Sequence, residues 1–396
     1  MASVLIAALS GRALAQSARK AGYAPLVVDA FGDQDTRNAA DHLIQLKSAI
    51  HAGFRKKSLT AALDELFANA TSKPIGLILG AGFEDQPALV ATLANKFKIL
   101  GNDAKTITTV KDPARLFASL HERGIRYPDT QFDPPTNMSG WLKKRIGGTG
   151  GVHITQCELG KNASQTPNYY YQRQHNGIPV SIAGAVNRSG FAIGLCRQWP
   201  SPTPVHPYRF GGLVTPPVID PDTEARMIDM TVELTRAFDL KGFISIDFLI
   251  TSSDTGEDIL LLEINPRPTA ALSILDGDDG HMFKAHVAAT QQTDPTKVVT
   301  NSANHTQRAR AVAYLYADTS DIEIPDIDWP AWAHDRPLPG TRIKRYRPLA
   351  SVSSESKNAD VAEQLCRDRL GELKRLLYGQ TQSAGTTGQR TKDFNV

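Results

Sequence analysis

Residues 242–272 read GFISIDFLITSSDTGEDILLLEINPRPTAAL, two apolar runs separated by turn-forming residues. Each run is typical of a buried β-strand, so the stretch predicts an antiparallel hairpin with SDTG at its turn. A carboxylate interrupts each run, Asp247 in the first and Glu263 in the second. Charged side chains seldom lie in such strands without a partner, so the hairpin raises the question of what these two carboxylates bind.

The register of the hairpin determines which side chains share a face. If Asp247 stands opposite Glu263, the same register places Ser245 opposite Asn265, and all four side chains point the same way. Directly opposed residues have Cβ atoms roughly 4.5–5.5 Å apart, and two carboxylates at that distance repel each other. A divalent cation would remove this repulsion, and magnesium prefers oxygen ligands of this kind. The residues leave a second reading open, in which one carboxylate pairs with an arginine such as Arg267 or faces solvent.

The N-terminal part of the chain predicts a parallel α/β domain over residues 1–105. Buried strands alternate here with helical segments, in the order VLIAAL, ALAQSARKAGY, PLVVDAF, LTAALDELFANA and PIGLILG. Such an alternation is typical of a parallel sheet covered by helices. The SGR turn after the first strand lacks the G-x-G-x-x-G spacing, which argues against a dinucleotide-binding fingerprint.

The remainder of the chain predicts two further parts and a tail. Residues 106–295 contain a helix, a proline-rich linker and many short strands, among them GGVHI at 150–154, which indicates an antiparallel α+β domain. Residues 296–379 form a C-terminal extension that ends in an amphipathic helix and packs on the core. The polar residues 380–396 predict a disordered tail.

Composition narrows the class of protein. The 396 residues carry 44 Lys and Arg against 41 Asp and Glu, a net charge of +3 that is too small to indicate a nucleic-acid or membrane partner. The three cysteines form no CxxC pair, which favours a reducing compartment, and MASVLIAALSG lacks the basic residues of a signal peptide. We therefore expect a cytoplasmic protein. The LDGDDGH segment lacks EF-hand spacing and predicts a helix entry.

The segment LLEINPRPT, which follows a strand with a central aspartate, resembles the metal-binding signature of the ATP-grasp superfamily. That superfamily includes carboxylate–amine ligases and biotin-carboxylase-like enzymes, which activate a carboxylate or bicarbonate as an acyl phosphate. The resemblance implies that Asp247, Glu263 and Asn265 hold Mg²⁺, or Mn²⁺ in its place, against the phosphates of ATP. It also implies that Arg267 steadies the transferring phosphoryl group.

The segment WLKKRIGGTGGVHI resembles the lysine strand and glycine-rich phosphate loop of that superfamily. Lys144 can project a cation toward phosphates, and glycines let backbone N–H groups approach an anion without interference from Cβ atoms. The glycines concerned are Gly147, Gly148, Gly150 and Gly151. Taken without the resemblance, the same residues are also compatible with an ordinary glycine-rich hairpin turn.

Two later segments extend the resemblance. NYYYQRQHNGIPVSI resembles the segment that links the two ATP-grasp lobes, which implies that the backbone around Gln172, Arg173 and Gln174 contacts the adenine edge. YRFGGLVTP resembles a loop near the acceptor substrate, which implies that Arg209 binds a substrate carboxylate.

The N-terminal domain resembles that of predicted ATP-dependent carboligases, some of whose relatives are associated with pterin or furan one-carbon cofactors, including tyramine–glutamate ligases. This resemblance implies that Arg12 and Glu84 lie on the substrate side. One departure concerns VKDPARLF, where Pro113 stands at the position of a lysine in many ATP-grasp enzymes, with Lys111 and Arg115 nearby. It leaves open whether a second basic residue contacts the ATP phosphates.

These expectations combine into one prediction: an α/β and α+β multidomain protein with an ATP-grasp fold and an N-terminal Rossmann-like domain. ATP would lie between lobes formed around residues 110–185 and 186–295, and a small-molecule carboxylate would be activated and joined to an amine with release of ADP. The resemblance also implies a homodimer. Two alternatives stay open, a carboxylase-like enzyme that phosphorylates bicarbonate and an ATP-binding partner subunit without catalysis.

Overall fold

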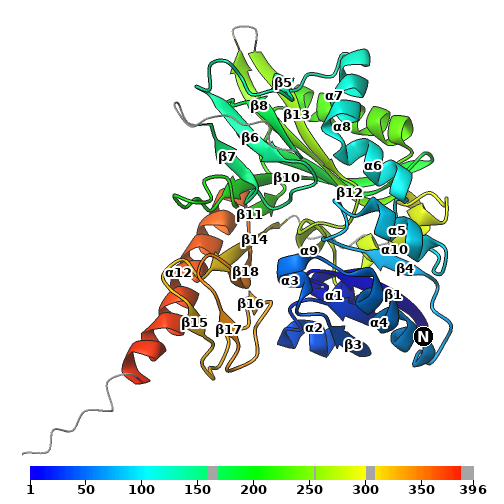
Figure 1. Ribbon diagram of the computed structural model, residues 1–396, viewed down its shortest axis with the longest axis vertical. Coiled ribbons are helices and arrows are strands. Elements are labelled where there is room, and N and C mark those ends of the chain that lie inside the picture. Colours follow the sequence, from blue (N-terminus) through cyan, green and yellow to red (C-terminus); the bar gives the residue numbers. More distant parts are fainter. Residues whose placement is uncertain (158–167, 254–255, 300–307, 385–396) are drawn as a thin grey trace, which may run out of the picture.

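The computed structural model describes residues 1–157, 168–253, 256–299 and 308–384. Figure 1 shows an N-terminal domain in blue, two lobes in cyan and green, and a C-terminal segment that ends in a long helix. The predicted hairpin turn at Asp254 and Thr255 and the predicted tail from residue 385 onward lie outside the described residues.

The N-terminal domain is the predicted parallel α/β unit, with its sheet in the order β3-β2-β1-β4. β1 is buried on both faces, since Val4 and Ile6 join one core and Leu5 and Ala7 join another. A strand covered on both sides reads as a continuous apolar run, which explains VLIAAL. The elements are β1 (Ala2–Ala8), α1 (Arg12–Lys20), β2 (Tyr23–Asp29), α2 (Gln34–Ala39), β3 (His42–Gln45), α3 (Ala49–Ala52), α4 (Lys56–Ala68), β4 (Leu77–Leu79) and α5 (Pro87–Ala94).

The next lobe contains two helices and a small antiparallel sheet in the order β5-β8-β6-β7. Its elements are α6 (Ala104–Lys111), α7 (Pro113–Glu122), β5 (Thr130–Gln131), β6 (Trp141–Arg145), β7 (Ile154–Gln156) and β8 (Tyr169–Arg173). The GGVHI segment is not the strand that we predicted, because β7 begins only at Ile154. Gly150 and Gly151 adopt φ values of 67° and 73°, which belong to a left-handed turn and not to extended backbone.

An eight-stranded sheet in the order β13-β12-β9-β10-β11-β14-β18-β16 forms the centre of the molecule. The C-terminal segment completes this sheet, because β14 pairs with β11 and β18 pairs with β14. Helices α8 and α10 pack on opposite faces, α8 in one core with β12 and α10 in the core shared with β1. The elements are β9 (Ile178–Asn187), β10 (Gly190–Pro200), β11 (Phe210–Thr215), α8 (Pro221–Phe238), β12 (Gly242–Ser253), β13 (Gly256–Asn265), α9 (Leu272–Leu275), α10 (His281–Thr290), α11 (Thr296–Val299), β14 (Ala309–Tyr316), β15 (Ile322–Glu323), β16 (Ala333–His334), β17 (Arg342–Ile343) and β18 (Pro348–Ser356).

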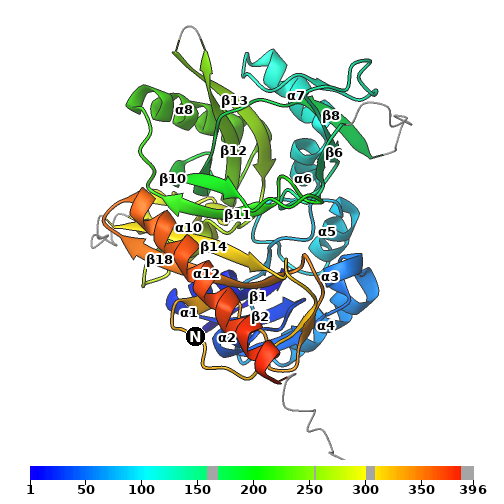
Figure 2. The same cartoon turned by 90° about the vertical axis from the view of Figure 1, so that its left-hand side faces the viewer.

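The closing helix α12 (Ala359–Ala384) lies across β14 and β18, as Figure 2 shows. Leu373 and Leu377 of the predicted apolar face are fully buried on its inner side together with Cys366, whereas Val361 of the same predicted face is 52% exposed. The helix continues to Ala384, past residue 380 where we predicted the tail to begin. None of the helices in the described ranges is both long and apolar enough to cross a membrane.

The β12–β13 hairpin has the predicted register. Asp247 pairs with Glu263 and Ser245 pairs with Asn265. A bulge follows, since Phe248 pairs with Leu261, and it shifts the register of the residues nearer the turn. The predicted helix entry is also confirmed, because Asp276 Oδ1 accepts a hydrogen bond from the backbone N–H of Met282 at 2.9 Å.

Candidate active site

The three predicted metal ligands lie together on one face of the hairpin. Asp247 Oδ1 accepts hydrogen bonds from Ser245 Oγ and Gln198 Nε2, each at 3.0 Å. The Asn265 amide group donates to Asp247 Oδ2 at 3.0 Å and to Glu263 Oε1 at 3.2 Å. Asp247, Glu263 and Asn265, with Lys111 described next, are called the carboxylate cluster below.

Lys111 brings a positive charge to this cluster from α6. Its Nζ lies 2.9 Å from Asn265 Oδ1 and 3.3 Å from Glu263 Oε2. α6 ends at Lys111, and α7 begins at Pro113 after the capping residue Asp112. The side chain of Lys111 is only 8% exposed, so its stem is packed and its ammonium group is directed at the hairpin.

The two carboxylates are electrostatically unequal. Burial, and then the charge of Glu263, raise the pKa of Asp247 above its ordinary value. Burial would also raise the pKa of Glu263, but the charges of Lys111 and His153 outweigh it and lower that pKa. The cluster therefore holds one ionised carboxylate beside Lys111 and one carboxyl group that favours a proton when no other cation is present.

This donor set suits a divalent metal ion. The ligands offered are two carboxylates and an amide, all oxygen donors of the type that Mg²⁺ prefers. Side chains of Asp247 and Glu263 are half-buried, so solvent and ligands can reach them. No three His, Cys, Asp or Glu side chains gather at a common point in the described part of the chain, so the third protein oxygen offered at this site is that of the Asn265 amide. The residues present thus fit magnesium held partly by substrate phosphates.

Lys144 lies on the inner face of the small sheet. Its Nζ donates to Gln172 Oε1 at 2.6 Å, and Gln172 in turn donates to Thr130 Oγ1 at 3.1 Å. Burial lowers the pKa of Lys144 to about 8, and the negative charge of Glu263 opposes that shift. Lys144 therefore lies within electrostatic reach of the carboxylate cluster, although it belongs to the other lobe.

Two glycines of the loop at 147–151, Gly148 and Gly151, are packed too closely for a side chain. A Cβ atom on Gly148 would lie 2.2 Å from the His153 ring, and one on Gly151 would lie 1.9 Å from the Tyr208 carbonyl oxygen. The Gly150 carbonyl accepts a hydrogen bond from the N–H of Phe210 at 3.0 Å. The loop thus bridges the small sheet and the 203–210 segment, and glycine is required at its contacts.

The predicted adenine-binding segment continues from β8. The N–H of Arg173 donates to the Asp129 carbonyl and that of Gln174 to the Gly140 carbonyl, each at 2.8 Å. These two N–H groups are engaged within the small lobe, and the Gln172 side chain is engaged with Lys144. A contact with the adenine edge from this segment would therefore use its carbonyl oxygens, and the assignment stays a prediction.

Arg267 and Glu84 are brought together from opposite ends of the sequence. They form an ion pair between Arg267 Nε and Glu84 Oε1. Glu84 also accepts hydrogen bonds from the N–H groups of Gly82 and Phe83, at 2.8 Å and 2.9 Å. Burial would raise the pKa of Glu84, but Arg267 and Lys111 lower it. The pair joins the N-terminal domain to the end of the hairpin, next to the cluster.

The other two candidate substrate residues are engaged within the protein. Arg12 Nε contacts Asp335 Oδ1 at 2.7 Å. Arg209 is fully buried and contacts both Asp318 oxygens at 2.8 Å, and its Nε donates to the Ser201 carbonyl at 3.0 Å. The guanidinium group of Arg209 is therefore engaged by Asp318 of the same chain, and its contact with a substrate carboxylate stays a prediction.

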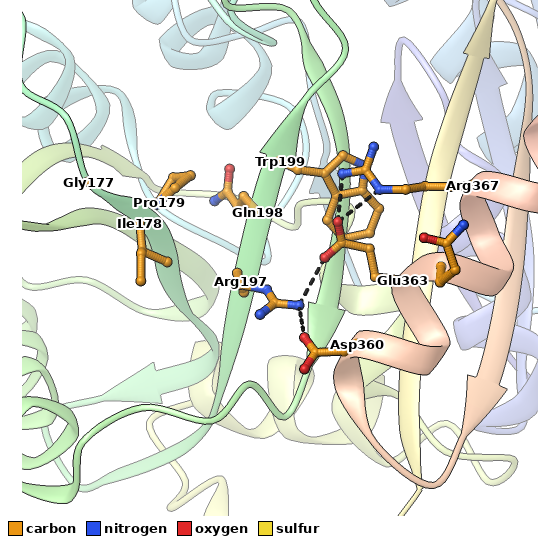
Figure 3. Close-up of a pocket in the computed structure, with 10 residues that line it drawn as sticks. Gly177, Ile178, Pro179, Arg197, Gln198, Trp199, Asp360, Glu363 and Arg367 are labelled. Carbon is orange, nitrogen blue, oxygen red and sulfur yellow. Dashed lines mark hydrogen bonds and ion pairs between the residues drawn. The ribbon is translucent and has the colours of Figure 1, made fainter.

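A surface cavity of about 430 Å³ lies where α12 meets β10, and Gln198, one of its lining residues, also donates to Asp247 of the cluster. Figure 3 shows Arg197 between Asp360 and Glu363, at 2.7 Å and 3.0 Å, while Glu363 also contacts Arg367. The charges lining this cavity are thus paired with one another. It is a joint between the C-terminal helix and the central sheet, and we do not assign the reaction to it.

Sequence reasoning missed two members of the site. Lys111 was noted only as a neighbour of Pro113, and no sequence signal gave the direction of its side chain. Gln198 was not considered, because its contact with Asp247 depends on β10 and β12 both pairing with β9. Once that strand order was known, the alternation of side chains along β10 could have identified Gln198 as a neighbour of Asp247.

Comparisons with known proteins identify a matching domain and a matching fold. Residues 110–271 match the family model of the ATP-grasp domain, and they include the whole carboxylate cluster, Lys144 and Arg267. No curated protein matches the sequence.

Solved structures with the same fold cover nearly the whole chain. The L-amino acid ligase from Bacillus licheniformis has a TM-score of 0.69 at 12% identity and covers 94% of this chain and 97% of its own. Biotin carboxylase from Campylobacter jejuni, in a β-γ-ATP complex, has a TM-score of 0.67 at 14% identity, with 90% and 88% covered. N5-carboxyaminoimidazole synthetase from Staphylococcus aureus, with ADP, has a TM-score of 0.65 at 17% identity, with 93% and 97% covered. The protein thus has an ATP-grasp fold with an N-terminal Rossmann-like domain.

Proposed function

We propose that the protein is an ATP-dependent ligase that activates a carboxylate as an acyl phosphate, releases ADP and joins the acyl group to an amine. The observation that carries this proposal is the carboxylate cluster, in which Asp247, Glu263 and Asn265 converge on paired strands within electrostatic reach of Lys144. A site that gathers oxygen ligands and a buried lysine is suited to a metal-bound polyphosphate.

The residues of the site have separate roles in this proposal. A divalent cation bound at the cluster would neutralise charge on the ATP phosphates. Lys144 supplies a second positive charge from the opposite lobe, and the N–H groups of the glycine loop approach the phosphates. Arg267, held by Glu84, orients the activated carboxylate. The glycine loop, whose Gly151 packs closely against the Tyr208 carbonyl oxygen, would cover the site and protect an acyl phosphate from water.

The names of the structural relatives support a carboxylate-activating reaction. They include an L-amino acid ligase, a biotin carboxylase with an ATP ligand and an N5-carboxyaminoimidazole synthetase with ADP. We propose glutamate as the first carboxylate to test, in the biosynthesis of a pterin or furan one-carbon cofactor, on the basis of the sequence resemblance. The carboxylase-like alternative would release ADP with bicarbonate and without any amine.

The reading as a non-catalytic partner subunit rested on the missing lysine at Pro113. Lys111 weakens that reading, since it places a positive charge at the cluster from two residues earlier. We further propose a homodimer, as in the 2-oxoglutarate carboxylase biotin carboxylase domain dimer from Hydrogenobacter thermophilus, and a cytoplasmic location, which suits three free cysteines. Sedimentation velocity would test the dimer.

The direct experiment combines the purified protein with Mg·ATP, a panel of carboxylates headed by glutamate, and hydroxylamine. ADP, AMP and hydroxamates are then measured by mass spectrometry. Carboxylate-dependent ADP with the matching hydroxamate is the expected result, because hydroxylamine captures an acyl phosphate. Formation of AMP would contradict the proposal, and bicarbonate-dependent ADP without a hydroxamate would favour the carboxylase reading.

A further inference from the structure

We propose that Lys111 is a built-in cation of the carboxylate cluster, and that a divalent metal ion must displace its ammonium group in order to bind. The proposal rests on the proposed function only in taking Glu263 and Asn265 as metal ligands. It adds a role for a residue outside the predicted site, and it makes metal binding a competition between two cations for the same oxygens.

The first argument is the convergence of two oxygens on one nitrogen. Asn265 Oδ1 and Glu263 Oε2, on alternate residues of β13, lie 2.9 Å and 3.3 Å from Lys111 Nζ. These are the amide and one of the carboxylate oxygens that the site offers to a metal. The ammonium group therefore already contacts part of the ligand set.

The second argument is the orientation of the Asn265 amide. Its nitrogen donates to Asp247 Oδ2 and Glu263 Oε1, so its oxygen is left facing Lys111. The opposite orientation would direct an N–H donor at an ammonium group and an oxygen at two carboxylates. Lys111 and the two acidic residues thus fix the amide jointly, with its metal-binding atom occupied by Lys111.

The third argument is that the position of Lys111 in the fold directs its ammonium group at the cluster. Lys111 terminates α6 at a sharp joint with α7, where Asp112 caps the following helix and Pro113 starts it. Its side chain is 8% exposed and is directed into the protein. Lys144, the other lysine within reach of Glu263, is bound to Gln172 at 2.6 Å. Lys111 is consequently the ammonium group in contact with the cluster in the described structure.

The fourth argument is that a metal ion and the Lys111 ammonium group cannot contact the same oxygens at the same time. Magnesium binds oxygen at about 2.0–2.1 Å, so a metal on Glu263 and Asn265 would lie within a few ångströms of an ammonium group in its present place. Two cations at that separation repel strongly in a partly buried site. Metal binding must therefore move Lys111 off these oxygens, and its flexible stem allows this without a change in the helix.

The test measures Mn²⁺ binding by electron paramagnetic resonance, without nucleotide, in wild type, K111M and K105M. Lys105 lies on the same helix but is exposed, so K105M is the matched control. We expect K111M to bind Mn²⁺ about 10-fold more tightly than wild type, because one nearby charge shifts cation affinity by one or more powers of ten. K105M is expected to match wild type.

K111R tests whether the effect of K111M comes from the lost charge or from altered packing. It also provides a test if K111M does not fold. An arginine keeps the positive charge, so K111R should bind Mn²⁺ no more tightly than wild type. A second readout is thermal unfolding: K111M should melt below wild type without metal, and saturating Mn²⁺ should reduce that difference.

The outcomes distinguish this inference from the proposed function. Equal or weaker Mn²⁺ binding by K111M, with clear binding by wild type, would overturn the role of Lys111 and leave the metal site intact. Tighter binding by K111R would also overturn it. If neither wild type nor K111M bound Mn²⁺ at millimolar concentration, with or without ATP, both the inference and the metal site of the proposed function would fail.

Discussion

The Arg209 site and the carboxylate cluster both bring charged side chains together inside the protein, but only in the first does each charged group have an oppositely charged partner of its own. Arg209 is fully buried, contacts both oxygens of Asp318, and lies over the Tyr316 ring at 3.7 Å. The cluster holds two carboxylates against one ammonium group, and both carboxylates are half-buried.

The difference indicates how to tell structure from function among buried charges. A matched pair with its hydrogen bonds made has no remaining capacity for a ligand, and breaking it costs folding free energy. Neighbouring carboxylates that solvent can reach repel each other, and this repulsion raises the free energy of the folded protein unless a further cation binds between them. From sequence, Arg209 was predicted to bind a substrate carboxylate and the cluster a metal ion, and only their partners in the fold distinguish the two sites.

The largest expected effect is on catalysis. E263Q removes the ionised carboxylate of the cluster while keeping its shape, so we expect turnover to fall on the order of 100-fold or more. The measurement is ADP release under saturating Mg·ATP, with circular dichroism to verify the fold. E257Q, an exposed position on the same strand, is the matched control and should keep wild-type turnover. Wild-type turnover in E263Q would contradict the assignment.

The second-largest expected effect is on the stability that the Arg209 site contributes. R209A removes a fully buried guanidinium group and leaves Asp318, whose side chain is 34% exposed, without its partner, so the free energy of unfolding should fall by about 2 kcal/mol. Urea denaturation measures this change. R188A is the control, because Arg188 and Asp239 form an exposed pair that should contribute less than about 1 kcal/mol. If R209A instead kept its stability and raised the KM for a carboxylate, Arg209 would be a substrate residue after all.

A smaller effect concerns the glycine loop. G151A forces a methyl group against the Tyr208 carbonyl, whereas G150A meets no atom within 4 Å, and both positions have positive φ. Each change should cost about 1–2 kcal/mol in backbone strain, but only G151A must displace the loop. We expect the KM for ATP to rise about 10-fold in G151A and clearly less in G150A, measured by initial rates. Equal effects would mean that the contact with Tyr208 does not position the loop.

The smallest effect is a change in the pH dependence of stability. Burial and Glu263 raise the pKa of Asp247 to about 7 in the folded, metal-free protein. Its contribution to stability is therefore fully present below the unfolded pKa, about 4, and is lost as the pH rises toward 7. D247N should remove this pH-dependent loss of stability, and saturating Mg²⁺ should reduce the loss in wild type. Thermal melts from pH 4 to 8 test this, and parallel profiles for the two metal-free proteins would contradict it.

The hairpin could be predicted from sequence because its information is local. Two apolar runs, a turn and period-two alternation fix which residues share a face, and Asp247 does pair with Glu263. The parallel order of the N-terminal domain follows from similarly local patterns. The apolar runs there are buried on both faces, as such runs predict.

The remaining features depend on contacts between distant residues. Arg209 and Asp318 are 109 positions apart, and Glu84 and Arg267 are 183 apart, so no local pattern could reveal either ion pair. Lys111 reaches the cluster only because of the joint between α6 and α7. The C-terminal segment was expected to pack on the core, but its β14 pairs directly with β11 in the central sheet. Strand partners of this kind are set by tertiary packing.

The central claim is that the unmatched carboxylates hold a divalent cation together with a nucleotide. Anomalous diffraction from crystals grown with MnCl₂ and a non-hydrolysable ATP analogue tests it most directly. The account predicts an anomalous peak bridging the analogue's phosphates and the oxygens of Asp247, Glu263 and Asn265. An analogue bound elsewhere, or a bound analogue whose manganese makes no contact with these three residues, would contradict it.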